Sequence, residues 1–433
     1  MNNNLTDYLE FLDNSPTAYH AVAESKRRLQ KAGFTELNPA VNWELKAGGK
    51  YFVVRNKSAL IAFIPGSKIR TKELRIIAAH TDSPALKIKP DPIIEAEEQY
   101  LLNTEVYGGP ILNTWYDRDL SLAGKVVLKD KTAFSVTEKL VDFKEAIAVI
   151  PNLAIHLNRE INDQAKIDKI KGLRAIFSQP LAVESAENDN KPNINKLIAD
   201  FCQLDPDKIL AADLYLYPVE KARLIGSNKE YIAAGRQDNL AMVHTALTAL
   251  SSADVKPWTQ MAVFYDNEEI GSNTPQGADS PFVTNLIKRI ADNFGLNSEE
   301  YYQLLEKSIL LSADMAHAVH PNFADQYDLK NKVKLNHGPV LKYNANLNYT
   351  THASTAAILI NLMQANQISY QNYTNRTDKK GGSTIGPISA TQLGIKSLDL
   401  GNSILAMHSA RELGGVADHL AMIKLMSLFY RSL

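Results

Sequence analysis

The sequence predicts an α/β protein in which helices cover a central sheet and a second, β-rich domain is inserted. Two observations predict it. From Asp238 onward, short apolar runs typical of buried strands alternate with stretches of helical apolar spacing. Between about Pro92 and Glu230, strand-type alternation dominates instead. The first pattern is typical of a sheet covered by helices, and the second favours a separate β-rich domain.

The change of pattern also predicts the domain boundaries. Strand-type alternation is clearest at residues 125–129 and 213–217. We therefore predict an inserted domain at residues 93–229 and a discontinuous main domain made of residues 1–92 and 230–433.

Apolar spacing predicts the elements of the main domain in turn. Helical spacing runs from Leu5 to Gly33 and ends at that glycine. Three apolar runs then predict strands at residues 51–55, 58–65 and 74–79. After Asp238 we expect helices at residues 239–251, 280–293, 355–367 and 418–430, and strands at residues 260–265, 308–312 and 396–400. Ligands of such sheets bind beyond the carboxyl ends of the strands.

Composition limits the class of protein. The 433 residues include 47 basic and 48 acidic side chains, so the chain lacks the basic excess of a nucleic-acid-binding protein. The single cysteine, Cys202, cannot form an intrachain disulfide, which favours a reducing compartment. The first residues lack a secretory pattern, and no uncharged apolar run approaches the roughly 18 residues of a membrane span. We expect a cytoplasmic protein without nucleic-acid or membrane partners.

Side chains that can bind metal follow three of the predicted strands. They are His80 after the first run, Asp266, Glu268 and Glu269 after the second, and Asp314 after the third. Asp238, at the start of a predicted helix, and His408, after an apolar run, offer the same chemistry. Each alone is more often a structural histidine, a solvated acidic face or a helix cap. Their recurrence matters because carboxylates at buried strand ends are costly unless cations neutralise them.

This mixture of imidazole and carboxylate ligands suits zinc, with manganese or cobalt as substitutes. Two ions that share one carboxylate need five protein ligands, which leaves one of the two adjacent glutamates as a general base for hydrolysis. Asp82, two residues after His80, either orients that imidazole or forms the turn before Ser83 and Pro84.

Competing motifs are weaker. The sequence contains no His-Glu-x-x-His, no Gly-x-Ser-x-Gly and no phosphate-binding loop. The glycine-rich residues 381–387 form either a turn or an anion cradle. His317 and His320 are followed by Pro321 and Asn322, which indicate a loop, so we leave both histidines out of the metal ligands.

Taken together, the motifs resemble the M18 metallopeptidases, the aspartyl aminopeptidase family. The matching blocks follow the family's order at residues 78–84, 151–159, 238–240, 266–272, 312–322, 338–342, 382–387 and 406–412. So many spaced blocks are a specific signal. The resemblance implies a zinc-peptidase-like fold, with a catalytic main domain and an inserted dimerisation domain.

The resemblance also implies roles for single residues. One zinc ion would be held by His80, Asp238 and Asp314, and the second by Glu269, His408 and the same Asp238. Glu268 would be the catalytic base, which takes a proton from a zinc-bridging water and returns it to the leaving amine.

Two further residues are expected to bind the substrate. His156, in the inserted domain, would enter the neighbouring subunit's active site, and Lys342 would suit an acidic substrate side chain. The chain departs from the family pattern at Gln237, where we expect leucine, and at residues 377–380, where eukaryotic members usually have a Pro-Cys pair. The second departure lies near the expected substrate pocket and adds neutral N-terminal residues to the expected range.

The resulting prediction is an aminopeptidase that removes N-terminal residues, acidic ones first, from peptides with two zinc ions per subunit. We expect a homo-oligomer, a dodecamer built from dimers. One alternative is a related zinc hydrolase, a carboxypeptidase or deacylase, with the same ligands. Another is a non-catalytic assembly or cargo-binding protein with structural metals.

Overall fold

The computed structural model describes residues 3–164, 166–179, 192–379 and 381–432. Lys380, in the segment at residues 377–380 that departs from the family pattern, lies outside the described residues. The chain forms two compact units. The first comprises Met1–Ser83, Ala222–Met407 and Glu412–Leu433. The second comprises Pro84–Lys221 and His408–Arg411.

The first unit is built on a nine-stranded mixed sheet with the strand order β1-β2-β3-β13-β4-β14-β18-β16-β17. These strands are β1 (Thr35–Glu36), β2 (Tyr51–Arg55), β3 (Ala59–Ile64), β4 (Leu74–His80), β13 (Thr259–Tyr265), β14 (Ile309–Ala313), β16 (Val340–Tyr343), β17 (Gln371–Thr374) and β18 (Lys396–Gly401). At its centre, β13, β4, β14 and β18 run parallel. The carboxyl ends of these four strands therefore lie side by side at one edge of the sheet.

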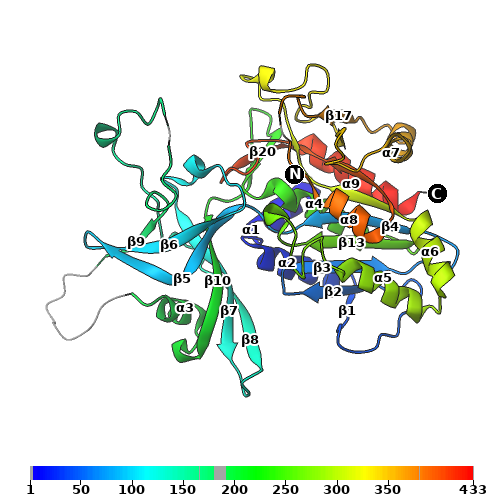
Figure 1. Ribbon diagram of the computed structural model, residues 1–433, viewed down its shortest axis with the longest axis horizontal. Coiled ribbons are helices and arrows are strands. Elements are labelled where there is room, and N and C mark those ends of the chain that lie inside the picture. Colours follow the sequence, from blue (N-terminus) through cyan, green and yellow to red (C-terminus); the bar gives the residue numbers. More distant parts are fainter. Residues whose placement is uncertain (1–2, 165, 180–191, 380, 433) are drawn as a thin grey trace. The chain divides into compact units, whose positions relative to one another are not determined.

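Helices cover both faces of this sheet (Figure 1). Along β4, Ile77 and Ala79 pack into one hydrophobic core, whereas Ile76 and Ala78 pack into the other. The first core includes residues of α1 (Asn3–Asp13), α2 (Ala18–Lys31), α4 (Gln237–Ser251), α7 (Ala353–Ala365) and α9 (Val416–Arg431). The second includes residues of α5 (Phe282–Asn293), α6 (Ser298–Lys307) and α8 (Ile385–Leu393). The predicted α/β class, a mixed sheet between helices, is confirmed.

Two differences from the expected elements have local causes. The helical region predicted from Leu5 onward is broken between Asp13 and Ala18, because Pro16 disfavours helical backbone in the residue before it. Helix α6 was not among the predicted helices; Asn297 and Glu300 begin it with a reciprocal capping box, and it buries Tyr301 and Leu304.

A smaller five-stranded sheet of the first unit has the order β11-β12-β20-β19-β15. Its strands are β11 (Arg223–Ile225), β12 (Tyr231–Ala234), β15 (Ala316–His317), β19 (Ser403–Leu405) and β20 (Glu412–Gly415). Ala234, which ends β12, pairs with Glu412, which begins β20. This pairing brings the start of α4 close to Glu412.

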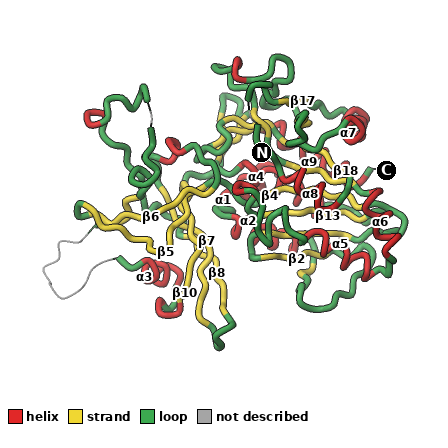
Figure 2. Tube along the Cα trace, viewed as in Figure 1, coloured by secondary structure: helices red, strands yellow, loops and turns green. Residues whose placement is uncertain are grey.

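The second unit contains a six-stranded antiparallel sheet with the order β8-β7-β10-β5-β6-β9. Its strands are β5 (Ala85–Ala96), β6 (Gln99–Tyr107), β7 (Leu120–Lys129), β8 (Val136–Asp142), β9 (Ala175–Ser178) and β10 (Ile209–Pro218). Figure 2 shows these strands with the short helix α3 (Ile194–Cys202), whose Ile198 and Ala199 join the unit's own core. Among the described residues, no helix has the length and apolar character needed to cross a membrane.

Candidate metal centre

His80 ends β4 and is almost fully buried, with 1% of its surface exposed. Its Nδ1 lies 3.1 Å from the backbone oxygen of Asp82 and 3.4 Å from Oδ1 of the same residue. Its Nε2 lies 3.6 Å from Oδ1 of Asp238. One ring nitrogen is thus held by Asp82, and the other faces carboxylates, which is the arrangement of a ligating imidazole.

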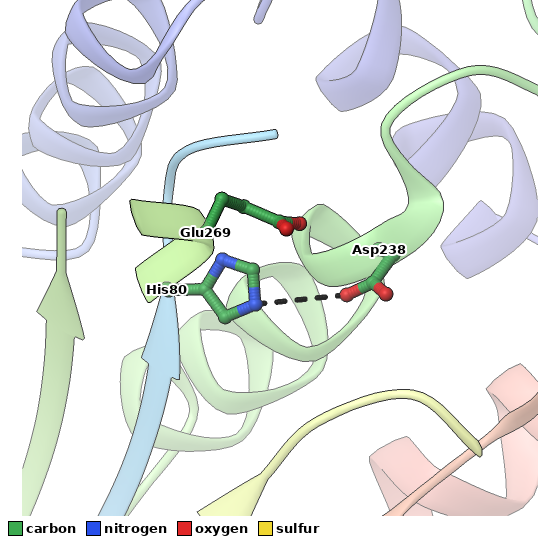
Figure 3. A group of neighbouring side chains, drawn as sticks. All are labelled: His80, Asp238 and Glu269. Carbon is green, nitrogen blue, oxygen red and sulfur yellow. Dashed lines mark ion pairs between the residues drawn. The ribbon is translucent and has the colours of Figure 1, made fainter. Parts of the chain in front are cut away.

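Three side chains converge at this point. His80, Asp238 and Glu269 each offer one ligand atom, and these atoms lie within 4.8 Å of one another. Figure 3 shows the imidazole of His80 directed toward Asp238, with the Glu269 carboxylate in the same space. They come from the end of β4, the start of α4 and the short helix η4 (Glu268–Ile270) that follows β13.

Contacts of its backbone fix Asp238, which is non-helical at the start of α4. Its N–H donates to Oε2 of Glu412 over 3.2 Å, and its carbonyl accepts from Oγ of Ser83 over 2.8 Å. The side chain of the neighbouring Asn239 donates to the carbonyl of Ala313, one residue before Asp314. Sequence reasoning did not single out Glu412 or Ser83, although both lie inside motif blocks.

Gln237 replaces the expected leucine and is 1% exposed. Its Nε2 lies within 3.3 Å of the carbonyl oxygens of Ile232, Ala234 and Glu412. The amide therefore ties β12 to β20 directly before Asp238, so this departure is accommodated by backbone hydrogen bonds.

Besides His80, Asp82 contacts the backbone of two glutamates. Its Oδ1 accepts the backbone N–H of Glu268 and its Oδ2 accepts that of Glu269, each over 3.1 Å. Both glutamates are therefore held by one buried carboxylate that also touches the imidazole.

Further ionisable side chains lie close to His80, Asp238 and Glu269. Oε2 of Glu268 lies 3.9 Å from Nε2 of His80. Burial raises the pKa of Glu268 well above its ordinary value. The charge of His80 opposes this rise in pKa, whereas the charges of Asp314 and Glu269 add to it. Burial alone would lower the pKa of His80, but the carboxylates of Asp238 and Asp82 raise it well above its ordinary value.

Asp314 follows β14, and burial raises its pKa, with a contribution from the charge of Asp238. The buried ammonium of Lys342 on β16 opposes this effect, since Nζ lies 3.7 Å from Oδ2 of Asp314. Buried carboxylates thus outnumber the cations beside them, which favours binding of a metal cation. The donor set of one imidazole nitrogen and several carboxylate oxygens fits zinc.

The other two predicted site residues belong to the second unit. His408 has its Nδ1 3.1 Å from the carbonyl oxygen of Gly109. His156 lies exposed in the short helix η2 (Ile155–Leu157). The cluster of His80, Asp238 and Glu269 is built from the first unit alone.

A mixed sheet between helices, with an imidazole and carboxylates gathered where its strands end, is typical of metal-dependent hydrolases. Residues 11–430 match the family described as aminopeptidase I zinc metalloprotease (M18), and the chain belongs to this family of zinc-dependent aminopeptidases. Membership favours the aminopeptidase over the carboxypeptidase, deacylase and non-catalytic alternatives.

Individual relatives agree with this assignment. A probable M18 family aminopeptidase 2 of Clostridium novyi (strain NT) is 42% identical over 427 residues, which span 98% of each chain. The cryo-EM structure of the Ape4 and Nbr1 complex contains a chain 36% identical, with a TM-score of 0.95, over 99% of this chain and 85% of that one. A chain of the S. cerevisiae mApe1 dodecamer is 26% identical, with a TM-score of 0.82, over 99% and 97% of the two chains.

Proposed function

We propose that this aminopeptidase removes N-terminal residues from peptides, aspartate and glutamate preferentially and neutral residues more slowly, with two zinc ions and Glu268 as the general base. The arrangement of Glu268 and Glu269 carries the proposal. Glu269 contributes to the ligand group, while the adjacent Glu268 has its carboxylate 3.9 Å from Nε2 of His80. One glutamate can then hold a metal and the other can move a proton.

In this proposal, His80, Asp238 and Asp314 hold one zinc ion, and Glu269, His408 and the same Asp238 hold the other. The contact of His408 Nδ1 with the Gly109 carbonyl supports a ligand role, since ligating imidazoles are usually held through their second nitrogen. When bound, zinc supplies a Lewis acid that polarises the scissile carbonyl and lowers the pKa of water; manganese or cobalt can take its place.

Glu268 performs the proton transfers. Its carboxylate accepts a proton from the attacking water and returns it to the leaving amine. Asp82 supports this step, because it accepts the backbone N–H of Glu268 and limits where the side chain can lie. The surrounding carboxylates provide the negative charge that the free α-amino group of a peptide requires.

Lys342 supplies the preference for acidic side chains. It is 3% exposed, and its ammonium lies near Asp314 at the edge of the cluster. A buried ammonium attracts a substrate carboxylate more strongly than a solvated one, because the surrounding dielectric is lower. Neutral side chains lose this attraction and are expected to react more slowly.

His156 completes the proposal from a neighbouring subunit. The segment that carries it exposes three apolar side chains, Leu153, Ile155 and Leu157, at 55%, 47% and 74% of their surface. Exposed apolar groups close together favour an interface. The similarity to the mApe1 dodecamer supports assembly of this chain as a dodecamer built from dimers, with the second unit as the dimerisation domain.

Cytoplasmic location is also part of the proposal. It is supported by the use of one cysteine, Cys202, in 433 residues, as expected of a chain in a reducing compartment.

A substrate panel tests the function. Chromogenic substrates with aspartyl, glutamyl, leucyl, alanyl and lysyl N-termini are compared with N-acyl amino acids, each with zinc, manganese or cobalt. We expect the aspartyl and glutamyl substrates to be hydrolysed fastest. Faster hydrolysis of N-acyl amino acids, or of the lysyl substrate, would contradict the proposal.

A further inference from the structure

A buried carboxylate that the proposed mechanism does not use lies on β18, between β14, which Asp314 follows, and β16, which carries Lys342. Asp399 is 0% exposed. It pairs with Ser312 of β14, two residues before Asp314, while the next residue on its strand, Leu400, pairs with Leu341 of β16. The side chain is therefore next to the candidate site without being one of its predicted members.

Its two oxygens hold two different segments of the chain. Oδ2 accepts the backbone N–H of Thr350 over 2.6 Å and the hydroxyl of the same threonine over 2.9 Å. Oδ1 accepts the hydroxyl of Thr384 over 2.6 Å. Thr384 in turn caps helix α8, because its Oγ1 accepts the N–H of Gly386 over 3.2 Å.

The glycine-rich motif approaches this carboxylate very closely. A Cβ placed on Gly386 would lie 2.6 Å from both oxygens of Asp399. A side chain at this position would therefore push the carboxylate away from Thr350 and Thr384. This close approach accounts for a glycine inside the motif at residues 382–387, since only glycine lets the backbone come this near.

The segment held through Thr350 also lies beside Lys342. Thr350 follows Tyr349, which is 4% exposed and whose ring centroid lies 5.2 Å from Nζ of Lys342. Thr351 adds a contact in the same place, since its hydroxyl accepts the backbone N–H of Asp399 over 2.9 Å. Asp399 thus holds the backbone N–H of Thr350 and the side chains of Thr350 and Thr351, directly after the tyrosine whose ring lies beside the ammonium.

We propose that Asp399 is a positioning residue for substrate selection: it holds the segment of Tyr349 and the loop at residues 382–387 beside Lys342, and thereby sets the preference for acidic N-terminal residues. The inference rests on the proposed role of Lys342 in binding the substrate. Asp399 itself does not touch the substrate, so its replacement should change selectivity while the hydrolysis of neutral substrates continues.

The test measures kcat and KM of the zinc-loaded enzyme for aspartyl and leucyl chromogenic substrates. In Asp399→Asn, one acceptor oxygen becomes an amide donor. The ratio of kcat/KM for the aspartyl substrate to that for the leucyl substrate should fall about tenfold, mainly through a higher KM for the aspartyl substrate. Thr384→Val, which lacks the hydroxyl, should lower the ratio in the same way, and Thr384→Ser should keep it.

Two comparisons separate positioning from other causes. Glu24→Gln is the matched control, because Glu24 is also a buried carboxylate and accepts hydrogen bonds from Arg27 and Arg28 of its own helix α2. It should leave the ratio unchanged even where the melting temperature falls. If Asp399 acted through its charge alone, Asp399→Asn would favour acidic substrates and raise the ratio.

Lys342→Met distinguishes the failure of this inference from the failure of the proposed function. If Lys342→Met lowers the ratio but Asp399→Asn and Thr384→Val keep or raise it, Asp399 has no positioning role and Lys342 retains its own. If Lys342→Met leaves the ratio unchanged, both the role of Lys342 and the inference from it are wrong.

Discussion

The backbone N–H of Glu268 donates to Oδ1 of Asp82 over 3.1 Å, so the proposed base is held by a residue 186 positions away in the sequence. The other oxygen of the same carboxylate accepts the N–H of Glu269. The proposed metal ligand Glu269 and the proposed base Glu268 are adjacent in the chain, and one carboxylate holds the backbone of both. Their proposed roles depend on this contact.

Replacing Glu268 with glutamine should reduce kcat by about a hundredfold to ten-thousandfold, the usual contribution of a positioned general base. The zinc content should remain, because the ligands are untouched. Steady-state kinetics and metal analysis of the same preparation measure both quantities. The exposed Glu306 of helix α6 provides the control, Glu306→Gln, which should behave as wild type. A Glu268→Gln enzyme that keeps its zinc and nearly all of its activity would show that another group takes the proton.

Replacing Asp82 with asparagine places an amide donor against one of the two backbone N–H groups. Loss of a hydrogen bond to a charged group costs about 1.5–3 kcal/mol, so kcat should fall by about tenfold to a hundredfold. If Asp82 acts by holding Glu268, the double variant Asp82→Asn/Glu268→Gln should be little worse than Glu268→Gln alone. Fully multiplicative losses in the double variant would mean that the two residues act independently.

Chelation should remove activity and also lower the melting temperature. The carboxylates of Asp238, Glu269 and Asp314 lie close to one another, and His80 and Lys342 offset only part of their mutual repulsion when the cations leave. Added zinc, manganese or cobalt should restore both properties. Differential scanning fluorimetry with and without chelator measures the stability. An unchanged melting temperature, in an enzyme shown to have lost its metal, would contradict this account of the cluster.

A buried histidine pair of the first unit predicts how stability depends on pH. His244 Nδ1 lies 3.1 Å from His419 Nε2, and His419 stacks on Tyr8 with ring centroids 3.8 Å apart. Burial lowers the pKa of His244 and lowers that of His419 well below its ordinary value. As the pH falls, the unfolded chain takes up protons on these histidines at a higher pH than the folded chain does. The stability present above about pH 6.5 should therefore be lost as the pH falls toward the folded-state pKa values.

Urea unfolding between pH 5 and 8 measures this loss. In His419→Phe, which keeps a ring to stack on Tyr8 but cannot titrate, the dependence of unfolding free energy on pH should be shallower than in wild type. Acid release of zinc affects both proteins, so the difference between their slopes reports the histidine. Equal slopes would show that His419 does not contribute.

Mixing subunits tests the proposed role of His156. His156→Ala and Glu268→Gln should each be nearly inactive alone. In a mixed dimer, the subunit with an intact Glu268 would receive an intact His156 from its partner, so one of the two sites should regain activity. Co-expression with two affinity tags isolates the mixed species. If the mixed dimer stays inactive while both variants assemble normally, His156 does not act across subunits.

Local pattern was sufficient for much of the fold. The strands that carry the site, β4, β13 and β14, coincide with the predicted runs to within about a residue at each end, because buried strands are continuous apolar segments that periodicity detects. The break at Pro16 was missed because apolar spacing continues across it, although proline chemistry could have indicated it. Helix α6 was also missed, although a capping box at Asn297 and Glu300 begins it and Tyr301 and Leu304 are spaced as in a helix.

The sequence by itself determined that the chain is an α/β protein of the M18 family and that imidazole and carboxylate groups follow its strands. Only the tertiary structure decided that β13 and β4 are neighbours, that Asp82 holds Glu268 and Glu269, and that Asp399 joins Thr350 to Thr384. The physical reason is the distance along the sequence over which each interaction acts. Periodicity and capping act over a few residues, whereas strand order and buried hydrogen bonds join residues far apart in the chain, whose meeting depends on how the whole sheet assembles.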